Sequence, residues 1–284
     1  MSTKKTAEVK PAAASQTIDG WKLADGQFSP AKVGVVIEKE FPVYVNGEHL
    51  VTASLAPGME KEFVVGYLFG QGFIEDIEEL MSLLIENNAA KATIKAKGKA
   101  SPVAARTNYR IVSGGGRTAY FETTGFRKIN SEIKISKENI FRAMNTLFEN
   151  ATLYAETEGV HAAGLFTTTA DPICIAEDIG RHNTLDKIIG YALLHKLDCS
   201  QTLLVSTGRM ASEMVTKVCR CGIPVVATKT AVTNKGLEIG KKCGLTVIGF
   251  VRDTGTKINT DMDVRVIKAA GMKIYSGADR ILCE

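Results

Sequence analysis

From about Gly159 onward, short apolar segments alternate with segments whose apolar residues recur at helical spacing. The segments TLLVS, PVVAT and LTVIGFV are apolar through their centres, which is typical of strands buried on both faces. Such strands form a mostly parallel sheet between two layers of helices. We expect strands at 163–167, 173–177, 202–206, 224–228 and 245–251, and helices at about 183–196, 211–221 and 234–243.

The N-terminal half has a different pattern. Residues 30–56 alternate between apolar and polar positions, and Asn46-Gly47 is a typical hairpin turn. A helix is expected from about Pro57 to Gly70, and another after Ser136, which is a favourable N-cap residue. We therefore predict an α/β protein in three parts. These are a disordered lead (1–18), a smaller α+β region (19–130) and an α/β domain (131–284).

The composition is that of an ordinary globular protein, because 45% of the residues are hydrophobic and 23% are charged. The N-terminal lysines precede no apolar core of a signal peptide, and charges interrupt the apolar runs before membrane-spanning length. We therefore expect a cytoplasmic location and no membrane association. A net charge of +4 without an arginine-rich arm argues against a nucleic-acid partner.

The six cysteines lie mostly in apolar stretches, and none of them forms a C-x-x-C pair. This favours reduced core thiols over a disulfide framework or a zinc ribbon, so no metal site is expected. Cys219 and Cys221 are close in sequence, near the end of an expected helix. Side chains two positions apart on a helix diverge by about 200°, which argues against a joint redox or metal site.

Charged and small polar residues follow four of the expected strands at the point where each strand ends. In a parallel sheet, the carboxyl ends of the strands and the helices that follow meet along one edge. Helix N-termini at such an edge favour anions. The convergence of cations there predicts an anionic ligand, and we expect that ligand to contain a nucleotide. The residues are Arg181, His182 and Asn183 after the second strand, Ser206, Gly208 and Arg209 after the third, Lys229 after the fourth, and Arg252 and Asp253 after the fifth.

Each of these residues also has a purely structural interpretation. Arg181 and Arg209 are alternatively surface ion-pair partners of nearby acids. Asn183 or Asp178 is expected to be the N-cap of the following helix. The alternative for His182, after the second strand, and for His161, before the first strand, is a structural role in which the ring is held by hydrogen bonds.

Several blocks of the sequence resemble, in order and spacing, those of the formate dehydrogenase accessory protein family, FdhD. They are GVHAAGLF, EDIGRHNTLDKIIG, STGRMASEMVTKVCRCGIPVVATKTAVT and LTVIGFVRDT, and VNGEHLVTASLAPGMEKEFVVGYLFGQGFI resembles that family's N-terminal block. The resemblance covers about residues 35–275. It implies a cytidine-deaminase-like three-layer sandwich with a mixed, mostly parallel sheet, and a homodimer. It also implies sulfur transfer from a cysteine desulfurase to the molybdenum bis(pterin guanine dinucleotide) cofactor, before that cofactor enters formate dehydrogenase.

The resemblance also implies which residues bind the cofactor. The implied ligand carries guanine nucleotides and diphosphates, with GDP as an expected mimic, which agrees with the cationic edge predicted above. The implied cofactor-binding residues are Phe250, Val251, Arg252, Asp253, Thr254, Gly255, Arg181, His182, Asn183, Ser206, Gly208 and Arg209. The strand-end argument adds Lys229, and His161, before the first strand, is a further candidate.

The sequence departs from the family pattern at the sulfur-carrying C-x-x-C loop. That loop is expected between Arg106 and Thr123, where no cysteine occurs. A persulfide relay needs a thiolate, so no catalytic residue is assigned. Either another cysteine serves an active sulfurtransferase, or the chain is a non-catalytic carrier of the pterin nucleotide. A zinc hydrolase of the deaminase type is disfavoured, because the chain lacks H-x-E followed by P-C-x-x-C.

Overall fold

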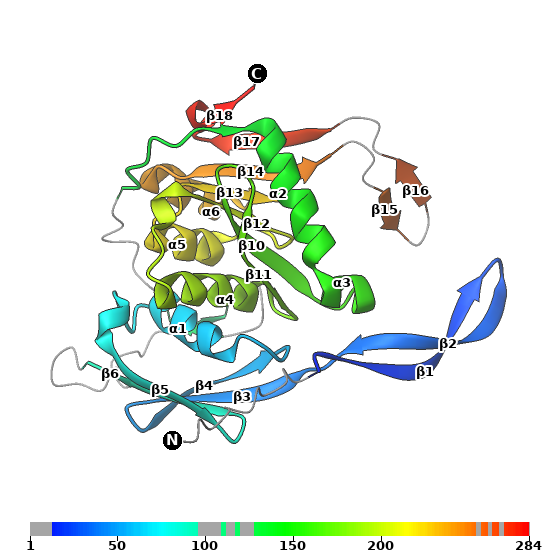
Figure 1. Ribbon diagram of the computed structural model, residues 1–284, viewed down its shortest axis with the longest axis horizontal. Helices are drawn as coiled ribbons and strands as arrows, with labels where there is room; N and C mark the ends of the chain where they lie inside the picture. The colour runs from blue at the N-terminus through cyan, green and yellow to red at the C-terminus, as the bar shows by residue number, and fades with distance from the viewer. Residues whose placement is uncertain are drawn as a thin grey trace, which may run out of the picture.

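A six-stranded mixed sheet organises the C-terminal half of the chain (Figure 1). The computed structural model describes residues 13–95, 109–111, 117–119, 128–253, 257–260, 263–266 and 270–283. The strand order is β11-β10-β12-β13-β14-β17. The strands are β10 (His161–Thr167), β11 (Pro172–Asp178), β12 (Thr202–Ser206), β13 (Val225–Thr228), β14 (Thr246–Arg252) and β17 (Gly271–Ser276).

The expected mixed sheet is confirmed, but most neighbouring strands are not parallel. Strand β13 runs parallel to β12 and β14, whereas β10 is antiparallel to both of its neighbours and β17 is antiparallel to β14. The reason is the short turn after β10, which returns the chain directly as a hairpin rather than through a crossover helix. Strands β11, β12, β13 and β14 nevertheless point in the same direction, because two antiparallel pairings through β10 restore it.

Helices cover both faces of this sheet (Figure 1). One face is packed against α4 (Arg181–Leu194), α5 (Ser212–Cys221) and α6 (Asn234–Cys243). The other face is packed against α2 (Lys137–Asn150), which is followed by α3 (Thr152–Thr157). The Ser136 side chain accepts a hydrogen bond from the Asn139 amide, which confirms its expected capping role. Within the described ranges, no helix combines the length and the apolar character that a membrane span requires.

The N-terminal part contains a four-stranded sheet of order β4-β3-β6-β5 and the helix α1 (Glu60–Gly70). Its strands are β3 (Lys39–Val45), β4 (Glu48–Leu55), β5 (Leu80–Glu86) and β6 (Ala89–Ile94). The expected turn at Asn46-Gly47 joins β3 to β4, and both residues have the positive φ angles that a tight hairpin requires. The short 3₁₀ turn η1 (Ile77–Glu79) precedes β5.

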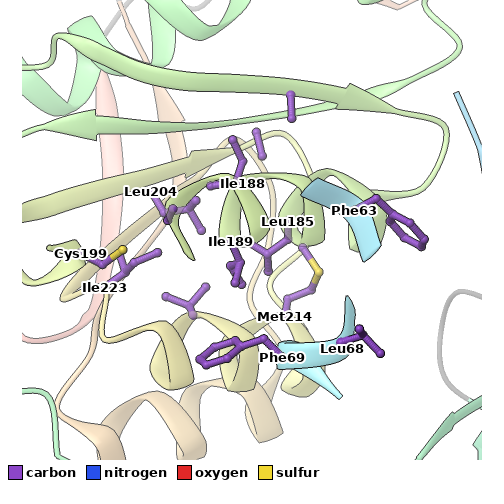
Figure 2. Packing of buried hydrophobic residues seen from close by; sticks show 14 of the residues in the cluster. Phe63, Leu68, Phe69, Leu185, Ile188, Ile189, Cys199, Leu204, Met214 and Ile223 are labelled. Carbon is purple, nitrogen blue, oxygen red and sulfur yellow. The ribbon is translucent and has the colours of Figure 1, made fainter. Parts of the chain in front are cut away.

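Helix α1 joins the N-terminal sheet to the C-terminal domain. Its buried Phe63 and Leu68 share one hydrophobic cluster with Leu185 of α4 and Met214 of α5 (Figure 2). The predicted regions on either side of residue 130 therefore share a core. Gly66 of α1 lies so close to α4 that an added Cβ would be 1.8 Å from the Asp186 carbonyl oxygen.

A long hairpin of β1 (Ser15–Ala24) and β2 (Gln27–Val36) precedes the N-terminal sheet (Figure 1). The prediction of a disordered lead over residues 1–18 is wrong for Ser15 to Ile18, because these residues pair with β2. Asp25-Gly26, a strong hairpin signal that the sequence analysis missed, forms the turn with positive φ at both positions. Residues 1–12 lie outside the described residues.

Short paired segments complete the described structure. They are β7 (Tyr109–Ile111) with β8 (Arg117–Ala119), β9 (Ile135–Ser136) with β18 (Ile281–Leu282), and β15 (Lys257–Thr260) with β16 (Asp263–Val266), together with the 3₁₀ turns η2 (Cys199–Gln201) and η3 (Ala278–Arg280).

Candidate functional site

The expected strand ends meet along one edge of the central sheet, here called the strand-end edge. Strands β11 to β14 all end there, and β10 begins there because His161 pairs with Asp178. Helix α4 starts three residues after β11, and α5 and α6 also follow strands that end at this edge. Their N-terminal amide groups and dipoles contribute positive potential to it.

A first cation group consists of Arg181 and Arg209, beside His161. Burial lowers the pKa of His161, and the charges of Arg181, His182 and Arg209 lower it further, opposed by Asp178. The pKa of Arg181 is lowered by its burial and by repulsion from Arg209, with an opposing attraction from Glu213. These charges are therefore near enough to act on one another. The Nδ1 atom of His161 lies 3.3 Å from Thr207 Oγ1, which fixes the ring beside the loop after β12.

The loop after β12 is held by its own small residues. The Ser206 hydroxyl accepts a hydrogen bond from the Gly208 amide at 3.0 Å, and the Gly208 carbonyl accepts one from Thr228 Oγ1 at 2.7 Å. A Cβ at Gly208 would lie 2.8 Å from the Arg181 Cβ, so the glycine allows Arg181 to pack against the loop. Ser206 is fully buried. Ser206 and Gly208 thus shape the edge rather than present side chains to a ligand.

A second cation group consists of Lys229 and Arg252, at the ends of β13 and β14. Burial lowers the pKa of Lys229, and the charge of Arg252 lowers it further. The Lys229 Nζ atom lies 4.3 Å from the centroid of the Phe148 ring. The buried Nε atom of Arg252 has no hydrogen-bond acceptor among the described residues. A buried donor without an acceptor is uncommon and fits an anion or a water at this position.

The β14 end bends at Phe250, which has a φ of 55° within a register shift between Gly249 and Arg252. Arg252 and Lys273 lie 5.9 Å and 4.7 Å from the Phe250 ring centroid. The Val251 side chain is buried in the cluster under α2, so only its backbone can face a ligand. Asp253 Oδ2 accepts a hydrogen bond from Asn145 of α2 at 2.8 Å. The predicted residues Thr254 and Gly255 lie outside the described residues.

The acidic and amide side chains of the EDIGRHN block make contacts with other parts of the protein. The N-cap of α4 is Gly180, so the prediction of Asn183 or Asp178 at that position is wrong. Asp178 instead forms a buried ion pair with Lys187 at 2.7 Å, and its Oδ1 accepts hydrogen bonds from the Gly180 amide and from Asn183. The Asn183 amide also donates to the Ser54 carbonyl at 2.8 Å, which ties α4 to β4.

Glu177, also in this block, accepts hydrogen bonds from the backbone amides of Leu153 and Tyr154 in the first turn of α3. His182 Nε2 lies 3.2 Å from Glu213 Oε2 of α5, without the angles of a hydrogen bond. Glu177 and Asp178 thus serve α3 and Lys187, whereas Glu213 is the acid that attracts Arg181. Phe148 and Asn145 of α2 were missed by the sequence analysis, which gave no signal that α2 reaches this edge.

Two thiol pairs lie at the opposite edge of the sheet. Cys221, at the end of α5, points at Cys199, which precedes β12, with 3.5 Å between the sulfur atoms. Cys219 instead lies beside Cys243 at the end of α6, which agrees with the expected divergence of Cys219 and Cys221. Cys174 is buried in β11, and burial raises its pKa to about 12. Strand β12 alone spans about 13–17 Å, which separates the Cys199 end from the strand-end edge.

A groove of about 440 Å³ lies along the outer side of β11, away from the two cation groups. Cys174 and Lys187 line it, together with Met59 of the loop before α1. It shares Glu177 with the network described above, but it contains none of the predicted cofactor-binding residues.

Comparison with known proteins places this chain in a family. The chain matches the FdhD/NarQ family model over residues 36–282. It is 35% identical over 244 residues to the sulfur carrier protein FdhD of Bacillus pumilus, covering 83% of this chain and 92% of that protein. The sulfur carrier protein FdhD of Sulfolobus acidocaldarius is 32% identical, with 84% and 94% covered. A crystal structure of a proposed formate dehydrogenase accessory protein from Desulfotalea psychrophila shares the fold, with a TM-score of 0.75, 22% identity and coverage of 95% and 100%. The chain belongs to the FdhD/NarQ family.

Proposed function

We propose that this protein is a formate dehydrogenase accessory protein that binds the molybdenum bis(pterin guanine dinucleotide) cofactor at the strand-end edge. There it would support sulfuration of the cofactor or its delivery to formate dehydrogenase or a related molybdoenzyme. The observation that carries the proposal is the gathering of Arg181, Arg209, Lys229 and Arg252 along this edge, where burial and the charge of a neighbouring arginine lower the pKa of Arg181 and that of Lys229. Membership of the FdhD/NarQ family, whose relatives are named sulfur carrier proteins, supports the accessory role.

The residues at the edge suit a nucleotide diphosphate. Repulsion within each cation group is relieved when an anion binds between its members, so each group favours a phosphate. The Nε atom of Arg252, which has no acceptor in the described part of the chain, supplies a donor that is already desolvated. Phe250, between Arg252 and Lys273, offers an aromatic surface next to these charges, as a base or pterin ring requires.

Calorimetric titration with GDP tests the binding site. Arg252→Gln and Arg209→Gln should each weaken GDP binding about 10- to 100-fold, because each removes a charged hydrogen-bond donor. Lys241→Gln is the matched control, since it removes an exposed positive charge near the far end of α6 and should change the affinity less than about twofold. The same affinity in all four proteins, or no affinity of the wild type, would contradict the proposed site.

The cysteine positions favour a second candidate, a non-catalytic carrier that holds the cofactor without transferring sulfur. The stretch from Arg106 to Thr123 has no cysteine, and the paired thiols lie across the sheet from the cation groups. Incubation with a cysteine desulfurase and ³⁵S-cysteine distinguishes the two functions. A sulfurtransferase acquires reductant-sensitive label that is lost when all six cysteines are replaced by serine. A carrier binds GDP and stays unlabelled.

A further inference from the structure

Helix α2 brings an amide and an aromatic ring to the second cation group. Asn145 and Phe148 lie three positions apart on α2, so both side chains leave the helix on the same side. The Lys229 ammonium lies over the Phe148 ring, and the Asn145 Nδ2 atom donates a hydrogen bond to Asp253 Oδ2 at 2.8 Å. Asp253 directly follows Arg252. One side of α2 therefore holds both a cation and a carboxylate at the strand-end edge.

A carboxylate is unfavourable in a site that binds only phosphate. Its negative charge repels a phosphate and offsets part of the attraction from Lys229 and Arg252. An ionised carboxylate accepts hydrogen bonds and donates none, and its two oxygens offer about four acceptor positions. The Asn145 amide uses one of these positions and orients the Asp253 carboxylate. Asp253 therefore suits a part of the ligand that carries N–H or O–H donors.

We propose that Asp253, oriented by Asn145, selects the ring of the bound nucleotide by accepting hydrogen bonds from the N1–H and 2-amino groups of guanine. These two donors lie side by side on one edge of the ring, and a pterin carries the same pair. Adenine has an acceptor at N1 and no amino group at C2, so it cannot pair with a carboxylate in this way. The Phe250 ring, beside Arg252, supplies an apolar surface for the same ligand ring. The inference rests on the proposed nucleotide binding at the strand-end edge, and it adds Asn145 as a positioning residue.

Calorimetric titration with GDP and three analogues tests the selection in the wild type. Inosine diphosphate lacks the 2-amino group, so it should bind about 10- to 100-fold more weakly than GDP, because one hydrogen bond to a charged group is lost. Xanthosine diphosphate carries a carbonyl oxygen at C2, which repels the carboxylate, so it should bind more weakly still. The analogue 2′-deoxy-GDP keeps the guanine ring and should bind within about twofold of GDP.

Asp253→Asn should produce a gain of affinity that misfolding cannot mimic. The new amide donates to the C2 carbonyl of xanthine while its oxygen accepts from N1–H, so xanthosine diphosphate should bind at least about 10-fold more tightly than to the wild type. Asn145→Ala keeps the carboxylate but no longer orients it, so the preference for GDP over inosine diphosphate should fall at least about fivefold. The matched control is Asn150→Ala, which removes an exposed amide that donates to the Thr146 carbonyl of the same helix, and the preference should stay unchanged.

Thermal unfolding checks that the three variants fold. Equal affinity of the wild type for GDP and inosine diphosphate overturns the inference but leaves the nucleotide site in place, whereas no affinity for any of the four ligands overturns the proposed function as well. A wild type that discriminates against 2′-deoxy-GDP but not against inosine diphosphate also overturns it, in favour of ribose recognition by Asp253. So does an Asp253→Asn variant without improved binding of xanthosine diphosphate. If Asn145→Ala lowers only the thermal stability and keeps the preference for GDP, Asn145 is a structural contact and its positioning role is overturned.

Discussion

His161 makes the charge of the strand-end edge depend on pH. Its pKa is lowered from the ordinary 6.5 by burial and by the positive charges of Arg181, His182 and Arg209. A bound diphosphate would offset those charges and raise this pKa, so the complex binds more protons than the free protein. We therefore expect GDP affinity to rise as the pH falls through the window between the pKa of His161 in the complex and its pKa in the free protein.

Calorimetry in buffers of different ionisation enthalpy measures the proton uptake. His161→Gln should abolish this contribution while GDP's own titration remains, and an unchanged uptake would refute the linkage.

Lys217 pairs with the Asp186 carboxylate in the core. Its Nζ lies 2.6 Å and 2.7 Å from the oxygens of Asp186, and both side chains are almost fully buried. Lys217→Met leaves Asp186 buried without its partner, so unfolding in urea should show a loss of about 3–5 kcal/mol in the free energy of unfolding at pH 7.

Burial already raises the pKa of Asp186 above 3.8. Without Lys217 that pKa rises further, so the folded variant binds more protons than its unfolded chain. Its stability should fall as the pH rises above about 4. Asp186→Asn/Lys217→Met should recover much of the loss, and a variant without pH dependence would contradict this.

Between elements, the closest approach is the crossing of α1 and α4. Gly66 and Gly190 face the opposite helix, where an added Cβ would lie 1.8 Å from the carbonyl oxygen of Asp186 and of Glu62, respectively. Gly66→Ala forces the helices apart and should cost at least about 1–3 kcal/mol in the free energy of unfolding. The control Gly271→Ala adds the same methyl group where nothing lies within 4 Å, so it should change stability little. Equal stability of the two variants would show that the crossing tolerates separation.

Strands and helices of the C-terminal half were predictable because their apolar periodicity is strong. The first and last residues of β12 and α6 are as expected. Strand direction alone accounts for the gathering of four cations at one edge, namely Arg181, Arg209, Lys229 and Arg252. The antiparallel position of β10 was not predictable from composition, since a short turn rather than a helix decides it. The contact of Phe148 with Lys229 depends on how α2 crosses the sheet, which local sequence does not encode. The β1–β2 hairpin was missed because its strands face solvent and lack a clean apolar alternation.

Across the whole molecule, the central sheet separates two kinds of chemistry. Cations and helix N-termini lie at the strand-end edge, whereas the Cys199–Cys221 and Cys219–Cys243 pairs lie at the other. Strand β12 and helix α5 connect the two edges rigidly, since both are largely buried. Sulfur held on these thiols could not reach a nucleotide at the strand-end edge without a large rearrangement. This arrangement predicts that oxidation of the thiols at one edge leaves nucleotide binding at the strand-end edge unchanged.

Oxidation of the partly exposed Cys221 tests that independence. Its sulfur lies 3.5 Å from that of Cys199, so diamide should take two electrons and two protons from the pair and leave a Cys199–Cys221 disulfide. Peptide mapping by mass spectrometry detects this bond, and Cys221→Ser is the control that cannot form it. Because the pair lies a strand length from the cation groups, GDP affinity should change less than about twofold on oxidation. If oxidation instead weakens GDP binding more than about tenfold in the wild type but not in Cys221→Ser, the edges are coupled through β12 and α5 and the thiol pair controls cofactor binding.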